Sequence, residues 1–566
     1  MSKYNIKQFG AYSDGTNAAT TTTAIATALT TIGSVNPETL VFPAGTYALS
    51  GSVDWSTYTN ITFKMEPGAI ISHGSYTIHM ANAPEAGVYQ IFSGTGAKTF
   101  DRSLGVYPEW FGTTEYGAMI SQAILAIKAT GGEITFTRNM GATTAVNCTS
   151  TTGPILFKGR GSPAGAGGAG EFPKLTFTLS GGNAFDCTGA QAVTFENWAL
   201  ATDASSYPDI GILLARGADG ATGAAGHKFK FFKIDYSAKF TTAALYNYAS
   251  EELDFISCQF VNRVAGSRVV ILTASNINTK TSAFTTIYSG TSSMSTVNFY
   301  GGRYIQLGGA ATSDIFYLES AVDIHWHGGF WGNASGRAYI VANTNVGAVS
   351  HISIDSIRGE PGATSAYGLL FTSAVLTSSS NWAIRNSRWD CSTRNVYADV
   401  NSTLIKFTWQ NVSEQTSTGL QFVGSVSDSF FDKFSSLTIS GTSTNNLIIG
   451  VNSGITIGTR LRDMIFDLDN GEWLPFLAFG DLADSATPSV ANKSIWRTTG
   501  TTTITNLTGG REGEIKHILA ETGLTITDGT NIFLNGSVNW TMVATDSLTL
   551  ICRQSKWYEL SRSDNT

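Results

Sequence analysis

LDFISCQF, from Leu253 to Phe260, is the segment that decides the fold, because variants of it recur along the middle of the chain. In most copies the first and third residues are apolar, the second and fourth are mostly polar, and another large apolar residue follows seven positions after the first; the copy at Val322 is one residue longer and the copy at Ile352 is looser. The copies start at Val193, Phe229, Leu253, Ile277, Val297, Val322, Ile352 and Trp382. Successive starts are 20 to 36 residues apart, a period that indicates a solenoid.

The alternation within each copy predicts a β-strand with one face inside the protein and one face outside. A turn of small residues follows, and a further apolar strand precedes many copies, as in RVVILT (268–273) and IFYLES (315–320). Such coils are typical of a parallel β-helix, in which equivalent positions stack about 4.8 Å apart. A leucine-rich or helical solenoid is excluded, because these repeats contain no helical face. We therefore expect an all-β fold.

The composition agrees with strands and turns. Charged residues make up 14% of the 566 residues, 60 residues are glycine, and the formal charge is −7. Without a basic surplus we expect no nucleic-acid or membrane partner. The chain contains no run of 18 apolar residues and no signal peptide, which predicts a protein made in the cytoplasm that spans no membrane. The five cysteines are far apart, and we interpret them as buried apolar residues.

The N-terminal part contains one supersecondary unit twice. FGAYSDG (9–15) and FGTTEYG (111–117) each precede an amphipathic helical run, and LVFPAGTYAL (40–49) and EITFTRNMGATTAV (133–146) follow as strands. We interpret residues 1–105 as a cap-like β module. VYPEWFG (106–112) then opens the main solenoid, and the second helix is expected to cover its end. Trp110 should pack at this junction rather than bind sugar.

The C-terminal part departs from the repeat. We place the β-helix body at 106–425, a connecting β region at 426–498 and a small antiparallel β domain at 499–566. The turns TGG, TDG and LNG in this last segment are typical of tight hairpins. Its short strands predict little core of its own, so we expect trimerisation to cover exposed edges. Carbohydrate binding around Trp540 or Trp557 is the alternative role, although both are expected in the core.

Three segments carry a family resemblance. IKQFGAYSDGT with AIATAL and LVFPAGTY is similar to the N-terminal cap of pectate-lyase-like right-handed β-helices found in bacteriophage tailspikes and tail fibres. VYPEWFG followed by a helix resembles the start of many tailspike bodies, and the segment from TTTITNLTGG to KWYELSRS resembles the small β domain that ends many tail fibres.

The resemblance implies a right-handed parallel β-helix that assembles as a homotrimer in the virion tail. It implies a tailspike that binds a bacterial surface polysaccharide, capsule or O-antigen, and depolymerises it by glycosidic hydrolysis. A polysaccharide lyase acting by β-elimination and a non-enzymatic receptor-binding fibre are the alternatives. Because the cap begins at residue 4, we expect either attachment through a tail adaptor or baseplate protein or the removal of an N-terminal anchor domain. The 12 Trp, 20 Tyr and 32 Phe residues suit sugar stacking.

Candidate catalytic residues are carboxylates on the outward positions of the copies. Counting from the copy starts places Asp323 and Asp355 one coil apart and two residues apart along the strand, roughly 8 Å on the diagonal. Inverting glycosidases need two carboxyl groups roughly 6.5–9.5 Å apart. Glu319 is a candidate acid if Tyr317 and Trp326 screen it from water. Asp254, with the neighbouring pair Glu251 and Glu252, is a second candidate group.

Candidate substrate-binding residues lie on the same predicted face: Tyr300, His325, Trp326, Arg303, Lys280 and Arg385. For the lyase alternative, Lys280, Tyr300 or His325 would act as the base and Arg385 would neutralise the uronate. The HWH run (325–327) has no third ligand at a convincing spacing. We expect no metal and no cofactor.

Overall fold

The computed structural model describes residues 3–103, 105–112, 114–160, 172–217, 225–273, 295–310, 312–333, 336–343, 349–359, 366–372, 377–389, 391–414, 419–432, 434–450, 455–461, 463–467, 472–474, 479–491 and 493–565. The chain divides into two compact units. The first comprises 1–402 and 411–420, and the second 403–410 and 421–566.

The first unit begins with a short three-sided parallel solenoid. Its strands pair in three sheets of three: β1 (Lys3–Asn5), β2 (Glu38–Phe42) and β5 (Ile61–Met65); β3 (Gly45–Ala48), β6 (Ala69–Gly74) and β8 (Phe92–Gly94); β4 (Val53–Trp55), β7 (Ile78–Asn82) and β9 (Lys98–Arg102). The 3-10 helix η1 (Ile6–Phe9) and the helix α1 (Ala18–Ile32) stand at its start. Ile25 and Leu29 of α1 are buried, as the helical periodicity predicts.

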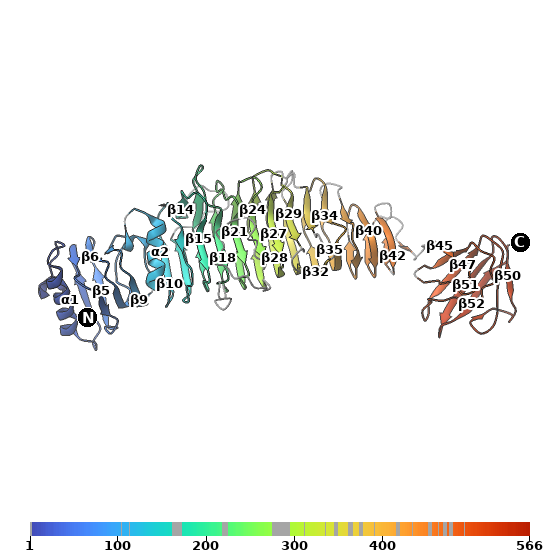
Figure 1. Cartoon of the computed structure of the whole chain (residues 1–566), viewed down its shortest axis with the longest axis horizontal. Helices are drawn as coiled ribbons and strands as arrows, with labels where there is room; N and C mark the ends of the chain where they lie inside the picture. The colour runs from blue at the N-terminus through green and yellow to red at the C-terminus, as the bar shows by residue number, and fades with distance from the viewer. Residues whose placement is uncertain are drawn as a thin grey trace. The chain divides into compact units, whose positions relative to one another are not determined.

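A second helical segment separates this module from the coils that follow. The 3-10 helix η2 (Pro108–Phe111) leads to α2 (Tyr116–Ile127), which contacts β9 on one side and the first strands of the next solenoid on the other. Figure 1 shows α2 between β9 and β10. Trp110 is 2% exposed and its Nε1 donates a hydrogen bond to the Gly87 carbonyl at 2.8 Å. The expected packing role of Trp110 is therefore confirmed.

The coils after α2 form three parallel ladders. The first contains β10 (Gly132–Phe136), β13 (Ile155–Gly159), β16 (Thr194–Glu196), β19 (Lys228–Lys230), β22 (Leu253–Ile256), β25 (Val297–Tyr300) and β32 (Thr377–Arg385). The second contains β11 (Met140–Ala142), β14 (Lys174–Phe177), β17 (Ala199–Thr202), β20 (Lys233–Ile234), β23 (Gln259–Asn262), β26 (Arg303–Gln306), β33 (Arg388–Trp389) and β36 (Ser413–Glu414). Two longer strands, β28 (Val322–Asn333) and β30 (Ser350–Gly359), run through both ladders.

The third ladder contains β12 (Val146–Asn147), β15 (Asn183–Thr188), β18 (Ile210–Ala215), β21 (Ala243–Tyr248), β24 (Arg268–Thr273), β27 (Asp314–Glu319), β29 (Ala338–Asn343), β31 (Tyr367–Thr372) and β34 (Arg394–Ala398). The strand pairs described within the three ladders are parallel, and each strand pairs with its counterpart one coil later (Figure 1). This is the parallel β-helix expected from the repeat, in the right-handed sense that parallel crossovers take.

An aromatic column holds the first ladder together from inside. Phe157, Phe195, Phe229, Phe255, Phe299 and Trp326 stack in succession with ring centroids 4.5–5.3 Å apart. The spacing follows from the distance between strands. Because every ring is fully buried, each contributes roughly 1.5–3 kcal/mol of apolar burial. The third position of each repeat therefore sets the register of the stack.

Left-handed backbone makes the two corners that flank the first ladder. The first corner column, just before the paired residues of the first ladder, contains Gly226, Glu252, Thr296, Asp323, His351 and Asn381, with φ between 57° and 72°. The second corner column, just after those paired residues, contains Asn197, Phe231, Ser257, Gly301, Gly328, Ser356, Asn386 and Asn411, with φ between 47° and 71°. These two columns mark where the side-chain rows begin and end.

The second unit contains further coiled strands and a separate C-terminal β domain. The coiled strands are β35 (Ser402–Gln410), β37 (Leu420–Phe422), β38 (Val426–Ser427), β39 (Phe430–Asp432), β40 (Leu437–Thr444), β41 (Leu447–Gly450), β42 (Ile455–Leu461) and β43 (Met464–Asp467), followed by the antiparallel β44 (Glu472–Leu474). The C-terminal domain has a six-stranded sheet in the order β45 (Phe479–Leu482), β46 (Ile495–Thr498), β47 (Ile515–Ala520), β51 (Ser547–Arg553), β52 (Lys556–Ser563) and β49 (Ile532–Phe533), and a pair β48 (Leu524–Ile526) with β50 (Trp540–Met542).

The C-terminal domain has antiparallel pairs at its centre, β47 with β51 and β51 with β52. Its core includes Ile518, Met542, Leu548 and Trp557, all at most 1% exposed. The expectation of little private core was therefore wrong, because residues from all eight strands and their loops converge on one cluster. Trp557 belongs to this core, as expected, and Trp540 packs against it from the edge.

Candidate functional site

The first corner column carries a line of polar side chains. Glu252, Thr296, Asp323, His351 and Asn381 occupy equivalent positions of successive coils, since the next residues pair as Leu253 with Val297, Val297 with Ile324, Ile324 with Ile352 and Ile352 with Trp382. Thr296 is β-branched yet has φ 59°. Left-handed backbone costs such residues roughly 1–2 kcal/mol, and the same conformation recurs along both corner columns.

Asp323 is the best-connected carboxylate of this column. Its Oδ2 accepts a hydrogen bond from Thr296 Oγ1 at 3.2 Å, and its Oδ1 lies 3.0 Å from His325 Nε2. The Asp323 side chain is 46% exposed and the His325 side chain 31% exposed, so solvent and a ligand reach both groups. Charge-assisted hydrogen bonds of this kind hold a carboxylate in one orientation.

Aromatic groups extend the surface beside this pair. Tyr300 and His327, level with each other in the first ladder, stack with ring centroids 5.3 Å apart and planes 13° apart. Tyr300 is 43% exposed, and the ring of His327 lies 6.3 Å from that of His325. A flat exposed ring next to hydrogen-bonding groups is a surface on which a sugar can stack.

The predicted spacing of Asp323 and Asp355 was wrong. Asp355 is level with His327, four residues beyond Asp323, instead of two. Four residues and one coil correspond to about 14 Å, which exceeds the span of an inverting pair. The physical reason is the left-handed corner at Asp323, φ 60°: the inward alternation begins at Ile324, so counting from Val322 misplaced the strand by two residues.

Asp355 instead forms hydrogen bonds with residues of the second corner column. Its Oδ1 accepts hydrogen bonds from Ser356 Oγ at 3.0 Å and from Asn386 Nδ2 at 3.1 Å. Asn411 Nδ2 in turn donates to Asn386 Oδ1 at 2.9 Å. These bonds run along the corner from coil to coil. They support a structural role for Asp355, which stabilises left-handed turns.

A buried histidine explains the other shifted copy. Phe229 is level with the third positions Phe195 and Phe255, so the first position of this coil is His227. His227 is fully buried, and burial lowers its pKa to about 4. Its Nδ1 accepts a hydrogen bond from the Val193 amide at 3.2 Å. Because a histidine occupies the position where the repeat has an apolar residue, the sequence pattern placed the start of this copy two residues too late.

A further prediction for this ladder is corrected. Trp326 is fully buried and stacks on Phe299 with centroids 5.0 Å apart, so its ring belongs to the core and does not bind substrate. The copy predicted at 277–284, with Lys280, lies outside the described residues.

Glu319 lies on the third ladder, in a buried polar network. It is 6% exposed, its Oε1 accepts a hydrogen bond from Asn343 Nδ2 at 3.0 Å, and its Oε2 accepts one from Thr273 Oγ1 at 3.4 Å. Asn343 also donates to the Tyr317 hydroxyl at 2.6 Å, and burial raises the pKa of that hydroxyl. Tyr317 thus neighbours Glu319 as expected, whereas Trp326 points into the core.

A buried ion-pair cluster adjoins this network. Asp314 is fully buried and receives Arg268 at 3.4 Å and Arg337 at 2.6 Å. Burial alone lowers the pKa of Arg337, but the hydrogen bond and the charge of Asp314 outweigh it, so the pKa is raised. Two arginines on one carboxylate satisfy the buried charge, which makes Asp314 a structural residue.

The remaining predicted residues lie on outward positions, exposed or half-buried. Asp254 Oδ1 accepts a hydrogen bond from Asn298 Nδ2 at 3.2 Å, one row beyond the first corner column. Arg385 is exposed and level with Asp355. Arg303 is half-buried, beyond the second corner column, with its Cζ 5.2 Å from the centroid of the Phe330 ring.

Within the ranges that the structure describes, no three His, Cys, Asp or Glu residues are grouped so as to hold a metal ion. No helix of those residues is long and apolar enough to cross a membrane.

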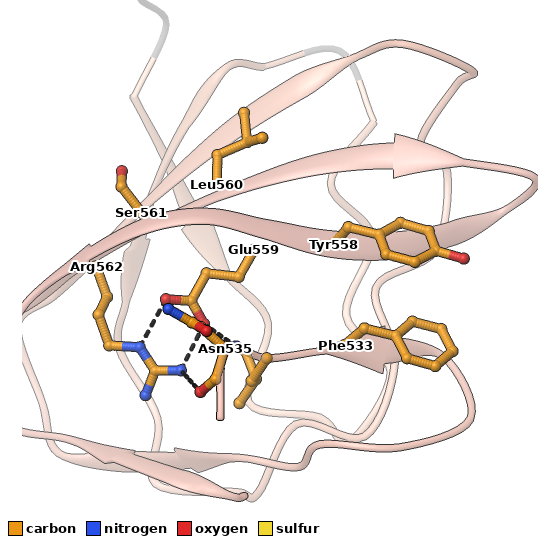
Figure 2. A pocket seen from close by; sticks show the side chains of 8 residues that line it. Phe533, Asn535, Tyr558, Glu559, Leu560, Ser561 and Arg562 are labelled. Atoms are coloured by element: carbon orange, nitrogen blue, oxygen red, sulfur yellow. Dashed lines mark hydrogen bonds and ion pairs between the residues drawn. The ribbon is translucent and has the colours of Figure 1, made fainter. Parts of the chain in front are cut away.

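A concave surface of about 450 Å³ lies in the C-terminal domain, lined by residues of β49, the turn after it, and β52. Figure 2 shows Phe533 and Tyr558 side by side, with Glu559, Arg562 and Asn535 grouped beyond them. The two rings stack at 4.8 Å. Burial alone raises the pKa of Glu559, but hydrogen bonds from Arg562 and the Asn535 amide outweigh it and hold the pKa below its usual value.

Comparisons with solved structures found chains that are similar to this one. The tailspike protein of Acinetobacter phage vB_ApiP_P1 shares 11% identity over 81% of this chain and 79% of its own, with a TM-score of 0.40. The gp42 tailspike of Acinetobacter phage vb_AbaP_AS12 shares 10% identity over 80% of this chain and 78% of its own, with a TM-score of 0.31. The chain is similar to phage tailspikes.

The mannuronan C-5 epimerase AlgE4 A-module of Azotobacter vinelandii shares 12% identity over 74% of this chain and 98% of its own, with a TM-score of 0.26. No protein-family model and no curated protein matches the sequence. At these identities and TM-scores the similarities carry no argument about activity, which rests on the residues of this chain.

Sequence patterns did not reveal the first corner column. Its members share a backbone conformation and not a residue type: glycine adopts left-handed φ freely, asparagine, aspartate and histidine adopt it more often than other residues, and threonine and glutamate do so rarely. His327 was also missed, because the two-residue shift placed His325 in its row. The positive φ of Asp323 was the decisive signal, and it becomes visible only in the folded backbone.

Proposed function

We propose that this chain is a bacteriophage tailspike that binds a bacterial surface polysaccharide and cleaves it by glycosidic hydrolysis. One observation carries the proposal: the first corner column aligns Glu252, Thr296 and Asp323 on the exposed side of successive coils. The motifs of the cap, the junction and the C-terminal domain support the tailspike assignment. We place the protein in the virion tail, with a tail adaptor or baseplate protein as its attachment partner.

The column offers two carboxyl groups in different surroundings. Glu252 and Asp323 are separated by two coils, about 9.6 Å between backbones, just above the roughly 6.5–9.5 Å between carboxyl groups that inverting enzymes use. Asp323 is held by Thr296 and His325, which suits a carboxylate that accepts a proton from water. Glu252 is exposed and would donate its proton to the leaving oxygen.

In the proposed reaction a water molecule attacks the anomeric carbon while its proton passes to Asp323. The glycosidic bond breaks, and the departing oxygen takes the proton of Glu252. Water is added across the bond and the anomeric configuration inverts. Tyr300 and His327 would hold the neighbouring sugar by stacking.

β-Elimination is the second candidate, and the contact between Asp323 and His325 favours it. A carboxylate 3.0 Å from an imidazole nitrogen orients that ring as a general base. His325 would then remove the proton next to a uronate carboxylate, the bond from the neighbouring carbon to the glycosidic oxygen would break as the carbon–carbon double bond forms, and the departing oxygen would take a proton from water.

Product analysis tests the proposal and separates the candidates. Purified protein is incubated with capsule and O-antigen preparations, and the released fragments are analysed by mass spectrometry. Hydrolysis gives fragments that have gained one water molecule, whereas elimination gives unsaturated fragments that absorb in the ultraviolet. Binding without any shorter fragment would leave a receptor-binding fibre and contradict both cleavage reactions.

We further propose that the chain acts as a homotrimer. The C-terminal domain exposes Ile515, Val538 and Leu560 to 43%, 61% and 54%, and association would cover such apolar side chains. Light scattering coupled to size exclusion should give three times the mass of one chain. A monomer would contradict the proposal.

A further inference from the structure

The outward positions of the second ladder carry a line of cationic side chains. In register order the aligned residues are Lys233, Gln259, Arg303, Phe330, Arg358 and Arg388. Four of these six residues are cationic and none is acidic, in a chain whose formal charge is −7. We call Arg303, Phe330, Arg358 and Arg388 the arginine row.

Among the residues that the structure describes, the arginines of this row have no counter-charge. No carboxylate of the described residues lies within 4.0 Å of their guanidinium nitrogens, in contrast to Arg268 and Arg337, which share Asp314. Arg358 is exposed, and Arg303 and Arg388 are half-exposed. The row therefore presents its charges to solvent and does not use them to stabilise the core.

The spacing of the row suits a charged polymer. Arg358 and Arg388 are direct neighbours in register, so their backbones lie about 4.8 Å apart. Like charges at that distance repel, and an anion between them relieves the repulsion. Guanidinium groups bind carboxylate and phosphate through two parallel hydrogen bonds. Phe330, half-exposed between two arginines, offers an apolar surface for a sugar ring.

A glycine corner connects the row with the surface around Asp323. Gly301 and Gly328 belong to the second corner column, directly after Tyr300 and His327. A Cβ added at Gly328 would meet no atom within 4 Å, so open space lies at this corner. A glycan that is bound along the arginine row could therefore pass over Gly301 and Gly328 without meeting a side chain there and reach the stacked rings of Tyr300 and His327.

We propose that the arginine row binds an acidic polysaccharide, whose anionic groups pair with successive arginines along the solenoid. The inference rests on the proposed function and deepens it, because it names the charge of the polymer. The anion is a carboxylate or a sulfate or phosphate ester, since guanidinium chemistry accepts each of them. A single-stranded nucleic acid is the competing ligand that the experiment must distinguish.

The test is affinity electrophoresis of the full chain in gels that contain polygalacturonate, dextran sulfate, neutral dextran or single-stranded DNA. The row variant combines Arg303→Gln, Arg358→Gln and Arg388→Gln. A matched control combines Arg102→Gln, Arg511→Gln and Arg553→Gln, which removes the same charge from exposed positions elsewhere. Thermal unfolding establishes that both variants are folded.

We expect the wild type to bind polygalacturonate, dextran sulfate or both, and not neutral dextran. The row variant should bind at least about tenfold more weakly, with the control within about twofold of wild type. If polygalacturonate alone retards the protein, the anionic group of the ligand is a carboxylate. If dextran sulfate retards it, the row accepts a sulfate or phosphate ester. Equal weakening in both triple variants, no retardation by either acidic polymer, or loss of DNA binding alone would overturn the proposal. Binding through the row without release of fragments from bacterial polysaccharide would contradict only the proposed hydrolysis.

Discussion

Replacing Asp323 by asparagine separates catalysis from stability at the proposed site. Asparagine has the same shape, and its carbonyl oxygen can still accept the Thr296 hydroxyl bond that measures 3.2 Å in the wild type. Asp323 is 46% exposed, so solvent screening keeps the cost in stability small. The substitution removes the carboxylate that accepts a proton from water. Because general-base catalysis contributes roughly 100- to 10,000-fold, we expect kcat/KM to fall by that factor, equivalent to about 3–5 kcal/mol of barrier.

The matched control is Asp355→Asn, the same substitution on the same ladder one coil later. Asp355 is about 14 Å from Asp323 by register, too far to share a glycosidic bond with it, so its activity should stay within about twofold of wild type. The assay measures reducing ends released from the host polysaccharide, with thermal unfolding recorded in parallel. An equal loss in both variants, or an Asp323→Asn enzyme that retains a tenth or more of the activity, would refute the register argument.

Glu252→Gln provides the complementary measurement. A missing general acid slows cleavage most when the leaving group is a poor one. The variant should therefore lose activity on the polysaccharide but recover it on an aryl glycoside whose leaving group needs no proton. Equal loss on both substrates would contradict the acid role and would point to a binding defect.

Three further predictions concern stability. His227 has a pKa of about 4 in the folded protein, below the ordinary 6.5, so its contribution to the free energy of unfolding is fully present above pH 6.5 and is lost as the pH falls toward 4. We expect the free energy of unfolding to fall by about 2 kcal/mol at pH 5. Faster amide exchange in β19 should report this loss, and the His227→Gln variant should not show it. Trp110→Ala should destabilise the junction by roughly 3–5 kcal/mol and expose it to proteolysis, whereas Trp110→Phe should destabilise it less. An alanine variant as resistant to proteolysis as the wild type would contradict the packing role. Glu559 has a lowered pKa, so its hydrogen bond to Arg562 stabilises the folded domain at neutral pH and is lost as the pH falls through that lowered pKa. Glu559→Gln should therefore lower the free energy of unfolding by about 2 kcal/mol at pH 7 and by little in strong acid. A loss that does not depend on pH would contradict the charge-assisted bond.

The amino-acid sequence by itself determined the solenoid. The alternation of LDFISCQF and its copies specifies which side of each strand is apolar, and the recurrence specifies that successive strands share one core. The two amphipathic helices and the junction role of Trp110 were predictable for the same reason, since periodicity of apolar residues encodes local burial. Exposed aromatic and charged positions, such as Tyr300 and Arg385, also followed from the pattern.

Only the tertiary structure decided which polar groups meet. Side-chain rows depend on register, and a left-handed residue at a corner shifts register without any mark in the hydrophobic pattern, as at Asp323. A buried polar residue has the same effect, as His227 does in the coil of Phe229. Trp326 was likewise predicted to bind sugar, but it is fully buried in the core. Local alternation therefore determines the strands, whereas the alignment of carboxylates and arginines across coils depends on backbone corners that form only when the coils stack.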